Sequence, residues 1–371
     1  MLAKEPSTIA WECPSNIALV KYWGKFEGQI PANPSLSFTL SSCVTQTSIA
    51  YQSDAEPRLE FLFDGQPKPT FEAKIQAYLN SLHDVLPWLK NTGLKIESHN
   101  TFPHSSGIAS SASAMGALAL GLVSVDRAMK GGFDPAELTQ DADFWRQASN
   151  LARRGSGSAC RSVYGGFTVW GRHEAVEGSD DRWAVPLDDR WAVPLGMDQI
   201  HPTFHDIQDV VLLVDRGEKS VSSSAGHGLM NQHPYAEARF KQGNERVGEL
   251  NALLKSASSV PDDELWWAFG DLVESEALTL HAMMLCSRPS FLLMKPKTLE
   301  ILEQIRRFRN QKKVPLFFTL DAGANIHLLF PANAQNDAME LLDKQIAAIL
   351  GPDSYLWDRL GVGPRPLTLP S

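Results

Sequence analysis

Short runs in which hydrophobic and polar positions partly alternate occupy the first third of the chain and predict β-strands. Among them, the hydrophobic positions of FEAKIQAYLNSLHDVLPWL (71–89) recur at helical spacing and predict one helix. The predicted strands, rich in β-branched and aromatic residues, are IALVKYW (17–23), SLSFTL (35–40), QTSIAYQ (46–52), LEFLFDG (59–65) and LKIESHN (94–100).

Helical spacing is more common in the rest of the chain. The segment 103–129 begins rich in serine and glycine and continues as a strongly apolar helix, and ADFWRQASNLARR (142–154) predicts a helix that ends at Gly155. Because strands and helices mix without strict βαβ alternation, we expect an α+β fold. Other predicted helices span 235–256, 263–285, 297–312 and 335–349, and other predicted strands span 165–171, 209–215, 316–321 and 325–330.

The composition shifts near residues 196–208, so we expect two lobes, residues 1–200 and residues 201–371. The octapeptide DDRWAVPL occurs twice in succession, at 180–187 and 188–195. Two such copies do not make a solenoid. We interpret them as a duplicated surface excursion and assign them no function.

Charge and composition exclude several classes of function. With 43% hydrophobic and 21% charged residues the chain is an ordinary globular one, and its net charge of −9 disfavours nucleic acids and anionic membranes as partners. The N-terminus lacks the apolar core of a secretory signal, and the most apolar stretch, 115–125, is too short to span a bilayer. None of the four cysteines has zinc-site spacing, so we expect free thiols and a cytoplasmic protein.

The serine-rich segment 103–116 is a candidate anion site. Small residues let a ligand approach the backbone, and the N-terminus of the helix that follows favours a phosphate. The alternative is a serine-rich helix cap that packs on a sheet. There is no Walker-type loop and no protein-kinase motif. The candidate hydroxyl donors are Ser110, Ser111 and Ser113.

A second candidate anion site is ARRGSGSACRS (152–162). Gly155 and Gly157 again permit close approach, and Arg161 can bind a carboxylate or phosphate with two parallel hydrogen bonds. Arg153 and Arg154 are predicted to be last-turn helix residues that complement the helix dipole. The added hydroxyl groups are those of Ser156 and Ser158.

Two further stretches carry charge beside apolar strands. In PSNIALVKYWGK (14–25), strand alternation would put Lys21, Trp23 and Lys25 on one face and Tyr22 on the other. The alternative, which this stretch alone favours, is that the lysines are solvated charges at a strand end. In FFTLDAGAN (317–325), Asp321 ends an apolar strand and is either a turn residue or a catalytic carboxylate.

Taken together, four motifs in one order resemble those of the diphosphomevalonate decarboxylases. The motifs are N-x-x-x-x-K-Y-W-G-K (16–25), P-x-x-x-G-I-A-S-S-A (103–112), R-R-G-S-G-S-A-C-R-S-x-x-G-G (153–166) and T-x-D-A-G-x-N (319–325). The resemblance covers about residues 8–350. The first and third motifs are specific to this family, whereas the serine-rich loop identifies only the GHMP small-molecule kinase superfamily of galactokinase, homoserine kinase and mevalonate kinase.

The resemblance implies a two-lobed GHMP fold with mixed and antiparallel sheets and an active site in the cleft between the lobes. It implies conversion of mevalonate 5-diphosphate and ATP to isopentenyl diphosphate, ADP, phosphate and CO₂ with Mg²⁺, and a homodimer. Asp321 would be the base or orienter for the C3 hydroxyl, Lys21 would lie near it, and Arg161 would hold the substrate carboxylate. Further substrate-binding positions are Asn16, Tyr22, Lys25, Ser156 and Ser158, and ATP-binding positions are Ser98, Asn100, Ser110, Ser111, Ser113 and Ser223. No residue is assigned as a metal ligand.

Two positions depart from the family pattern. Where the family commonly has P-T-A-A-G this chain has Pro103-His104-Ser105-Ser106-Gly107, and Ala324 replaces the proline of D-A-G-P-N. His104 is either a nucleotide contact or a satisfied loop histidine. The alternatives to the implied activity are a kinase that phosphorylates the C3 hydroxyl and stops, a decarboxylase that uses the monophosphate, and a catalytically dead nucleotide-binding regulatory homologue.

Overall fold

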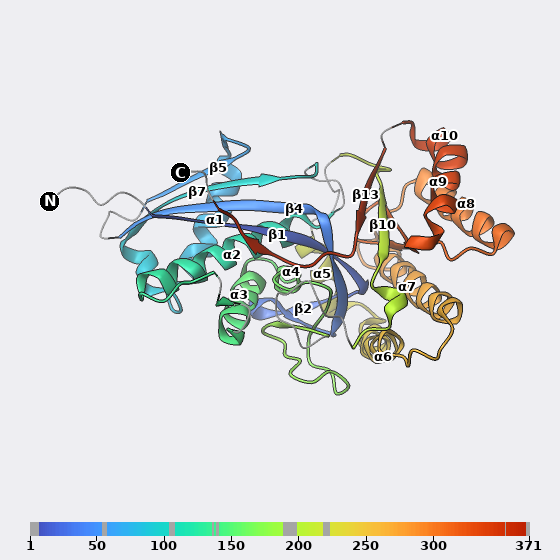
Figure 1. Cartoon of the computed structure of the whole chain (residues 1–371), viewed down its shortest axis with the longest axis horizontal. Helices are drawn as coiled ribbons and strands as arrows, with labels where there is room; N and C mark the ends of the chain where they lie inside the picture. The colour runs from blue at the N-terminus through green and yellow to red at the C-terminus, as the bar shows by residue number, and fades with distance from the viewer. Residues whose placement is uncertain are drawn as a thin grey trace.

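The computed structural model describes residues 7–53, 58–103, 108–135, 137–138, 141–187, 199–217, 223–352 and 354–368, apart from the side chains of Ser53, Ser223 and Ser224. Figure 1 shows two lobes arranged along the longest axis of the molecule. One lobe is built on a large sheet and the other on a smaller sheet, and helices cover both.

The sheet of the first lobe has the strand order β14-β1-β4-β7-β5-β6, with β8 paired to β4 and β9 paired to β8. Its long central pair, β1 and β4, is antiparallel, and the register shifts after Pro14 and after Ala18. Its strands are β1 (Ser7–Val20), β4 (Ser35–Ser53), β5 (Leu59–Phe63), β6 (Gln66–Pro67), β7 (Thr92–Asn100), β8 (Phe167–Trp170), β9 (Ala184–Pro186) and β14 (Arg365–Pro366). A separate short hairpin pairs β2 (Lys25–Phe26) with β3 (Ile30–Pro31).

Helices α1 (Pro69–Ser81), α2 (Ser110–Met129), α3 (Ala142–Gly155) and α4 (Ala159–Ser162) pack on one side of this sheet (Figure 1). Glycine lets α2 lie close to β1, because a Cβ at Gly116 would stand only 2.5 Å from Cys13 Sγ. By length and composition α2 would suffice to cross a membrane, but 72% of its most apolar 18-residue window is buried inside the protein. It is therefore a core helix.

The sheet of the second lobe is antiparallel, in the order β11-β12-β10-β13. Its strands are β10 (Ile207–Leu212), β11 (Phe317–Leu320), β12 (Ile326–Pro331) and β13 (Tyr355–Arg359). Its helices are α5 (Ser223–Gly228), α6 (Ala236–Leu254), α7 (Asp262–Leu285), α8 (Pro296–Lys312), α9 (Gln335–Leu341) and α10 (Ala347–Leu350).

Buried contacts join the two lobes. The carboxylate of Asp358, on β13, accepts hydrogen bonds of 2.7–2.9 Å from the backbone N–H groups of Ser41, Ser42 and Cys43 in β4. Strand β14 returns to pair with β1, and α6 and α7 pack against β1. As a result, the end of β1 lies beside α7.

The predicted α+β class with mixed and antiparallel sheets is confirmed, but several predicted elements are wrong in extent. The helix predicted over 71–89 ends at Ser81, and a separate 3₁₀ turn at Pro87–Asn91 follows, with Pro87 at its first position, where a missing N–H is tolerated. The strands predicted at 35–40 and 46–52 are two halves of β4. The division into residues 1–200 and 201–371 stays a prediction.

The interpretation of DDRWAVPL as a surface excursion is wrong for its first copy. This copy contains β9, and Ala184, Val185 and Leu187 are buried. Strand β9 pairs only with β8 among the described strands and so forms an edge of the sheet. The second copy, 188–195, lies outside the described residues.

Candidate active site

A cavity of about 620 Å³ is lined by residues of both lobes. The first lobe contributes the segment after β1, the N-terminus of α2 and the Ser156–Ser158 loop. The second lobe contributes Asp321, which follows β11, and His227 of α5. The cavity is large enough for a small-molecule ligand.

An ion pair joins the two lobes at this cavity. Lys21 Nζ donates to Asp321 Oδ1 at 2.9 Å, and the Lys21 side chain is 3% exposed whereas that of Asp321 is 25% exposed. The carbonyl of Asp321 accepts from Gly323 N–H at 2.7 Å and from His281 Nε2 at 3.1 Å. Burial is the main cause that lowers the pKa of His281 to about 4, so its ring is neutral at pH 7 and Nε2 carries the proton for this bond.

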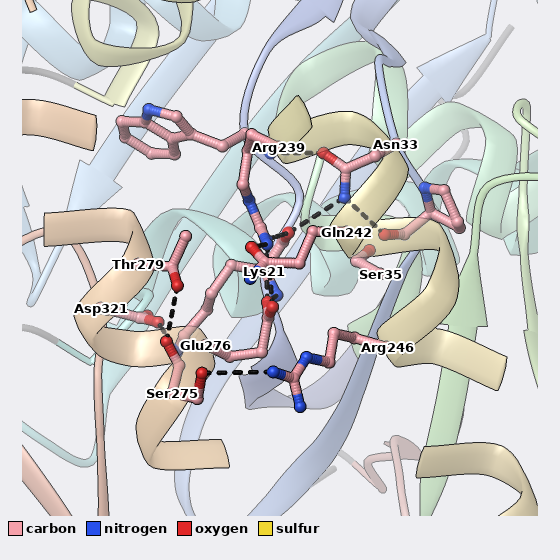
Figure 2. A network of polar contacts seen from close by, with 12 residues as sticks. Lys21, Asn33, Ser35, Arg239, Gln242, Arg246, Ser275, Glu276, Thr279 and Asp321 are labelled. Atoms are coloured by element: carbon pink, nitrogen blue, oxygen red, sulfur yellow. Dashed lines mark hydrogen bonds and ion pairs between the residues drawn. The ribbon is translucent and has the colours of Figure 1, made fainter. Parts of the chain in front are cut away.

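A second, deeper ion pair holds the backbone of Lys21 (Figure 2). Arg239 of α6 and Glu276 of α7 form two parallel hydrogen bonds of 2.8 Å each, and both side chains are buried. Glu276 also accepts from Lys21 N–H at 3.1 Å, and Arg239 donates to the Lys21 carbonyl at 2.6 Å. Asn33 Nδ2 donates to the same carbonyl at 3.1 Å. Both polar groups of the Lys21 peptide are therefore fixed by charged partners.

Arg161, in α4, offers a buried positive charge to the cavity. Its guanidinium donates to Asn16 Oδ1 at 3.1 Å and to Ser35 Oγ at 2.6 Å, and lies 5.7 Å from the centre of the Tyr22 ring. Burial lowers the pKa of Arg161, yet a guanidinium stays charged in proteins. None of its contacts within the described residues is with a carboxylate, so an anionic ligand would complete it.

The loop between α3 and α4 brings backbone to the cavity. A Cβ at Gly157 would lie 2.9 Å from both Tyr22 Oη and the Trp170 ring, so only glycine fits there without displacement. Ser156 Oγ lies 3.5 Å from Ser111 Oγ, which connects this loop to the N-terminus of α2. Free N–H groups at a helix N-terminus and adjacent hydroxyl groups suit phosphate.

The far end of the cavity is apolar. Phe61, Phe63 and Phe71 line it, and polar atoms at its edge come from Ser98 and Asn100 of β7. Ser98 Oγ pairs with Thr47 Oγ1 at 2.9 Å, and Asn100 Oδ1 accepts from Thr45 Oγ1 at 2.8 Å. An apolar slot with a few polar edges suits a flat heterocyclic base.

Most residues predicted for the site line this one cavity. They are Asn16, Lys21, Tyr22, Lys25, Ser98, Asn100, Ser110, Ser111, Ser156, Ser158, Arg161 and Asp321. Ser113 does not line it: this hydroxyl is fully buried and bonds Thr45 Oγ1 at 2.6 Å, because the side chain faces the sheet. His104 and the side chain of Ser223 lie outside the described part of the chain.

Two arginines of the third motif have structural contacts, as predicted for last-turn helix residues. Arg153 donates to backbone carbonyls of Gly28 and Arg182, and Arg154 pairs with Asp84 at 3.1 Å. Of the three arginines in the motif, only Arg161 lines the cavity.

The predicted strand alternation of Lys21, Tyr22, Trp23 and Lys25 is wrong. Strand β1 ends at Val20, and Gly24 has φ of +103°, so the chain turns and both lysines and both aromatic residues line the cavity. Sequence reasoning also missed the residues that fix this turn. No local motif identifies them, because Glu276 lies 255 positions from Lys21 in the sequence.

The described residues contain no group of three or more His, Cys, Asp and Glu side chains that would hold a metal by themselves. A divalent cation in this cavity would therefore depend on ligand phosphates, as Mg²⁺ commonly does. The carboxylate–ammonium pair, the buried guanidinium and the hydroxyl-lined helix N-terminus define the class: an enzyme that moves a phosphoryl group near a small anion.

Comparisons with known proteins agree with this class. A family model, the diphosphomevalonate decarboxylase-like N-terminal domain, matches residues 13–182. Diphosphomevalonate decarboxylase from Eremothecium gossypii is 30% identical over 348 residues, which cover 88% of this chain and 77% of that protein. The chain therefore belongs to the diphosphomevalonate decarboxylase family.

Solved structures confirm the fold that the resemblance implied. The crystal structure of mevalonate diphosphate decarboxylase from Staphylococcus aureus matches with a TM-score of 0.79 and 25% identity, covering 98% of each chain. A structure of MDDEF in complex with MVAPP, AMPPCP and magnesium matches with a TM-score of 0.77 and 24% identity, covering 98% of this chain and 99% of that one.

Proposed function

We propose that this protein converts mevalonate 5-diphosphate and ATP to isopentenyl diphosphate, ADP, phosphate and CO₂. The observation that carries this proposal is the Lys21–Asp321 ion pair of 2.9 Å in the same cavity as Arg161 and the Ser156–Ser158 loop. One carboxylate thus faces a space in which cationic and hydroxyl groups can hold both ends of a small polyanion. Membership of the decarboxylase family supports the same assignment.

Asp321 is the group that acts on the C3 hydroxyl. A tertiary alcohol is a very weak acid, so Asp321 mainly orients the hydroxyl and accepts its proton late, as the new P–O bond forms. Lys21 keeps this carboxylate ionised and lies where negative charge of the transferred phosphoryl group develops. Phosphorylation makes the C3 oxygen a leaving group.

Arg161 holds the substrate carboxylate for the second half of the reaction. Departure of phosphate builds positive charge at C3, and the C–C bond to the carboxylate then supplies the electron pair of the new alkene as CO₂ leaves. The hydrogen bonds that Arg161 donates to Asn16 and Ser35 fix its guanidinium and leave N–H groups free to bind the substrate carboxylate. The diphosphate end is assigned to Tyr22, Lys25, Ser156 and Ser158.

The nucleotide is assigned to the other half of the cavity, with its phosphates at Ser110 and Ser111 and its base in the apolar slot beside Ser98 and Asn100. The related complex with AMPPCP and magnesium supports ATP and Mg²⁺ as ligands. Bound Mg²⁺ would neutralise phosphate charge, and the hydroxyls of Ser110 and Ser111 fit a cation that is held mainly by the phosphates.

The test is the stoichiometry of products. Purified protein is incubated with ATP, Mg²⁺ and either mevalonate 5-diphosphate or mevalonate 5-phosphate, and CO₂ and ADP are measured. Equal yields of CO₂ and ADP from the diphosphate are expected. ADP without CO₂ would instead support a kinase that stops at the phosphorylated alcohol. Faster turnover of the monophosphate would change the substrate, and no turnover of either would support a regulatory homologue.

We also propose that the protein is a homodimer in the cytoplasm with neither nucleic acid nor membrane as a partner. The acidic net charge of −9 supports the absence of nucleic-acid and anionic-membrane partners, and the four free thiols support a reducing compartment. The homodimer is carried over from the family resemblance alone. Size-exclusion chromatography with light scattering measures the oligomeric state, and a monomer at micromolar concentration would contradict the dimer.

A further inference from the structure

His227, the histidine of α5, lies at the substrate end of the cavity, although no motif drew attention to it. Its ring stacks on that of Tyr22, with centres 4.4 Å apart and an interplanar angle of 22°. On another side it packs on the Trp23 ring at 4.6 Å. The imidazole is thus held between two aromatic rings of the K-Y-W-G-K segment and has little freedom to rotate.

One nitrogen of this ring is already committed. Gly24 N–H donates to His227 Nδ1 at 3.0 Å, so Nδ1 is the acceptor. A neutral imidazole has one acceptor and one donor nitrogen, and Nε2 is therefore the N–H. Among the described residues, Nε2 has no hydrogen-bond partner, and the ring lines the cavity.

Burial and two nearby positive charges keep the His227 ring neutral. Burial, then Lys25 and then Arg161 lower the pKa of His227 to about 3. Both cations line the same cavity and are assigned above to the substrate anions. In a cavity that already holds these two cations, a neutral N–H adds a directed donor without adding a third positive charge to the protein when the site is empty.

We propose that His227 is a substrate-binding residue whose Nε2–H donates a hydrogen bond to an oxyanion of the same substrate, whose diphosphate Lys25 contacts and whose carboxylate Arg161 contacts. This inference rests on the proposed function, because it takes mevalonate 5-diphosphate as the ligand. The oxyanion belongs either to the diphosphate or to the carboxylate of that substrate. The Gly24 hydrogen bond selects the tautomer, and the aromatic rings aim the donor.

A matched pair of variants separates this role from a structural one. In His227→Asn the amide oxygen can still accept from Gly24 N–H, but no donor remains at the place of Nε2. In His227→Gln the amide nitrogen reaches the place of Nε2, but the acceptor for Gly24 is lost. His227→Phe keeps a ring between Tyr22 and Trp23 but has neither the acceptor for Gly24 N–H nor the donor at the place of Nε2. It serves as a second variant without a donor should the asparagine variant unfold.

Binding of mevalonate 5-diphosphate is measured by calorimetry, and KM for both substrates is measured by turnover. We expect the Asn and Phe variants to raise Kd and KM for mevalonate 5-diphosphate by about 10- to 100-fold, with KM for ATP within about threefold of wild type. In the Gln variant, Kd and KM for mevalonate 5-diphosphate and KM for ATP should all stay within about threefold of wild type. Unchanged affinity in the Asn variant, or loss only in the Gln variant, would overturn the proposal.

Inorganic diphosphate identifies the oxyanion. If its affinity falls in the Asn variant by the same factor, the bond is to the diphosphate, and if it does not change, the bond is to the carboxylate. Failure of the proposed function is distinguishable, because wild-type protein would then release no CO₂ from mevalonate 5-diphosphate. If the wild-type protein releases CO₂ normally and the variants bind mevalonate 5-diphosphate as tightly as wild type, only the proposed role of His227 is refuted.

Discussion

Replacing Glu276 by glutamine should weaken the contacts that hold the backbone of Lys21 in place. The carboxylate of Glu276 is fully buried and accepts two parallel hydrogen bonds from Arg239 and one from the N–H of Lys21. A glutamine has the same shape, but its NH₂ group would face one of the donors, either the Arg239 guanidinium or the Lys21 N–H. It would also leave the positive charge of Arg239 uncompensated. Removing one partner of such a buried pair costs about 3–5 kcal/mol of unfolding free energy.

The catalytic effect follows from the same contacts. When the bonds to its N–H and carbonyl weaken, the Lys21 peptide can shift and carry the ammonium away from Asp321. A displacement of about 1 Å near reacting atoms costs about 10²-fold in rate. We therefore expect kcat of Glu276→Gln to fall by about 10²-fold. KM for ATP should stay within about threefold, because the residues proposed to bind the base and the phosphates lie on β7 and α2.

The assay needs a control at another buried carboxylate on the same helix. Glu274, also on α7 and buried, pairs with Arg306 and Arg309 and makes no contact with Lys21 within the described structure. Glu274→Gln should lose a similar free energy of unfolding in urea titrations but keep kcat within about threefold at a temperature where both variants are folded. An equal loss of kcat in the two variants would refute the positioning argument.

Two further predictions concern the same cavity. Folding lowers the pKa of His281 from 6.5 to about 4. Between pH 6.5 and pH 4 the unfolded chain therefore binds a proton at this histidine that the folded chain does not, and the free energy of unfolding falls as pH falls. His281→Gln, which keeps an N–H for the Asp321 carbonyl, should flatten the pH dependence of unfolding free energy between pH 6.5 and 5 by up to about 1.4 kcal/mol per pH unit, and an unchanged slope in urea titrations would contradict this. Gly157→Ala should raise KM for mevalonate 5-diphosphate by about tenfold in steady-state assays, because its Cβ would meet Tyr22 and Trp170 at 2.9 Å, and a wild-type KM would refute the crowding.

Most residues predicted for the site line one cavity in the structure, whereas several predicted elements around them differ in extent. Lys21, Arg161 and Asp321 stand in continuous motifs whose chemistry is readable before the chain folds, and all three line one cavity. Periodicity also located most strands and helices. It failed for α1, because the helical spacing of the sequence continues past the end of the helix at Ser81. It also failed for β4, which continues as one strand through a shift of register with β1.

The residues that position the site could not be read from the sequence. Arg239 and Glu276 are ordinary charged residues on helical surfaces until α6 and α7 pack against the end of β1. His227 likewise gains its tautomer only from the backbone of Gly24, 203 positions away. Such contacts depend on tertiary packing, and neither periodicity nor motif spacing contains them.

The central claim is that Asp321 acts on the substrate hydroxyl inside this cavity. The most direct measurement is the rate of CO₂ and ADP formation by Asp321→Asn, together with the affinity of the variant for mevalonate 5-diphosphate. The account predicts that both products fall together by at least about 10²–10⁴-fold while affinity stays within about tenfold. CO₂ and ADP formation near the wild-type rate would contradict it.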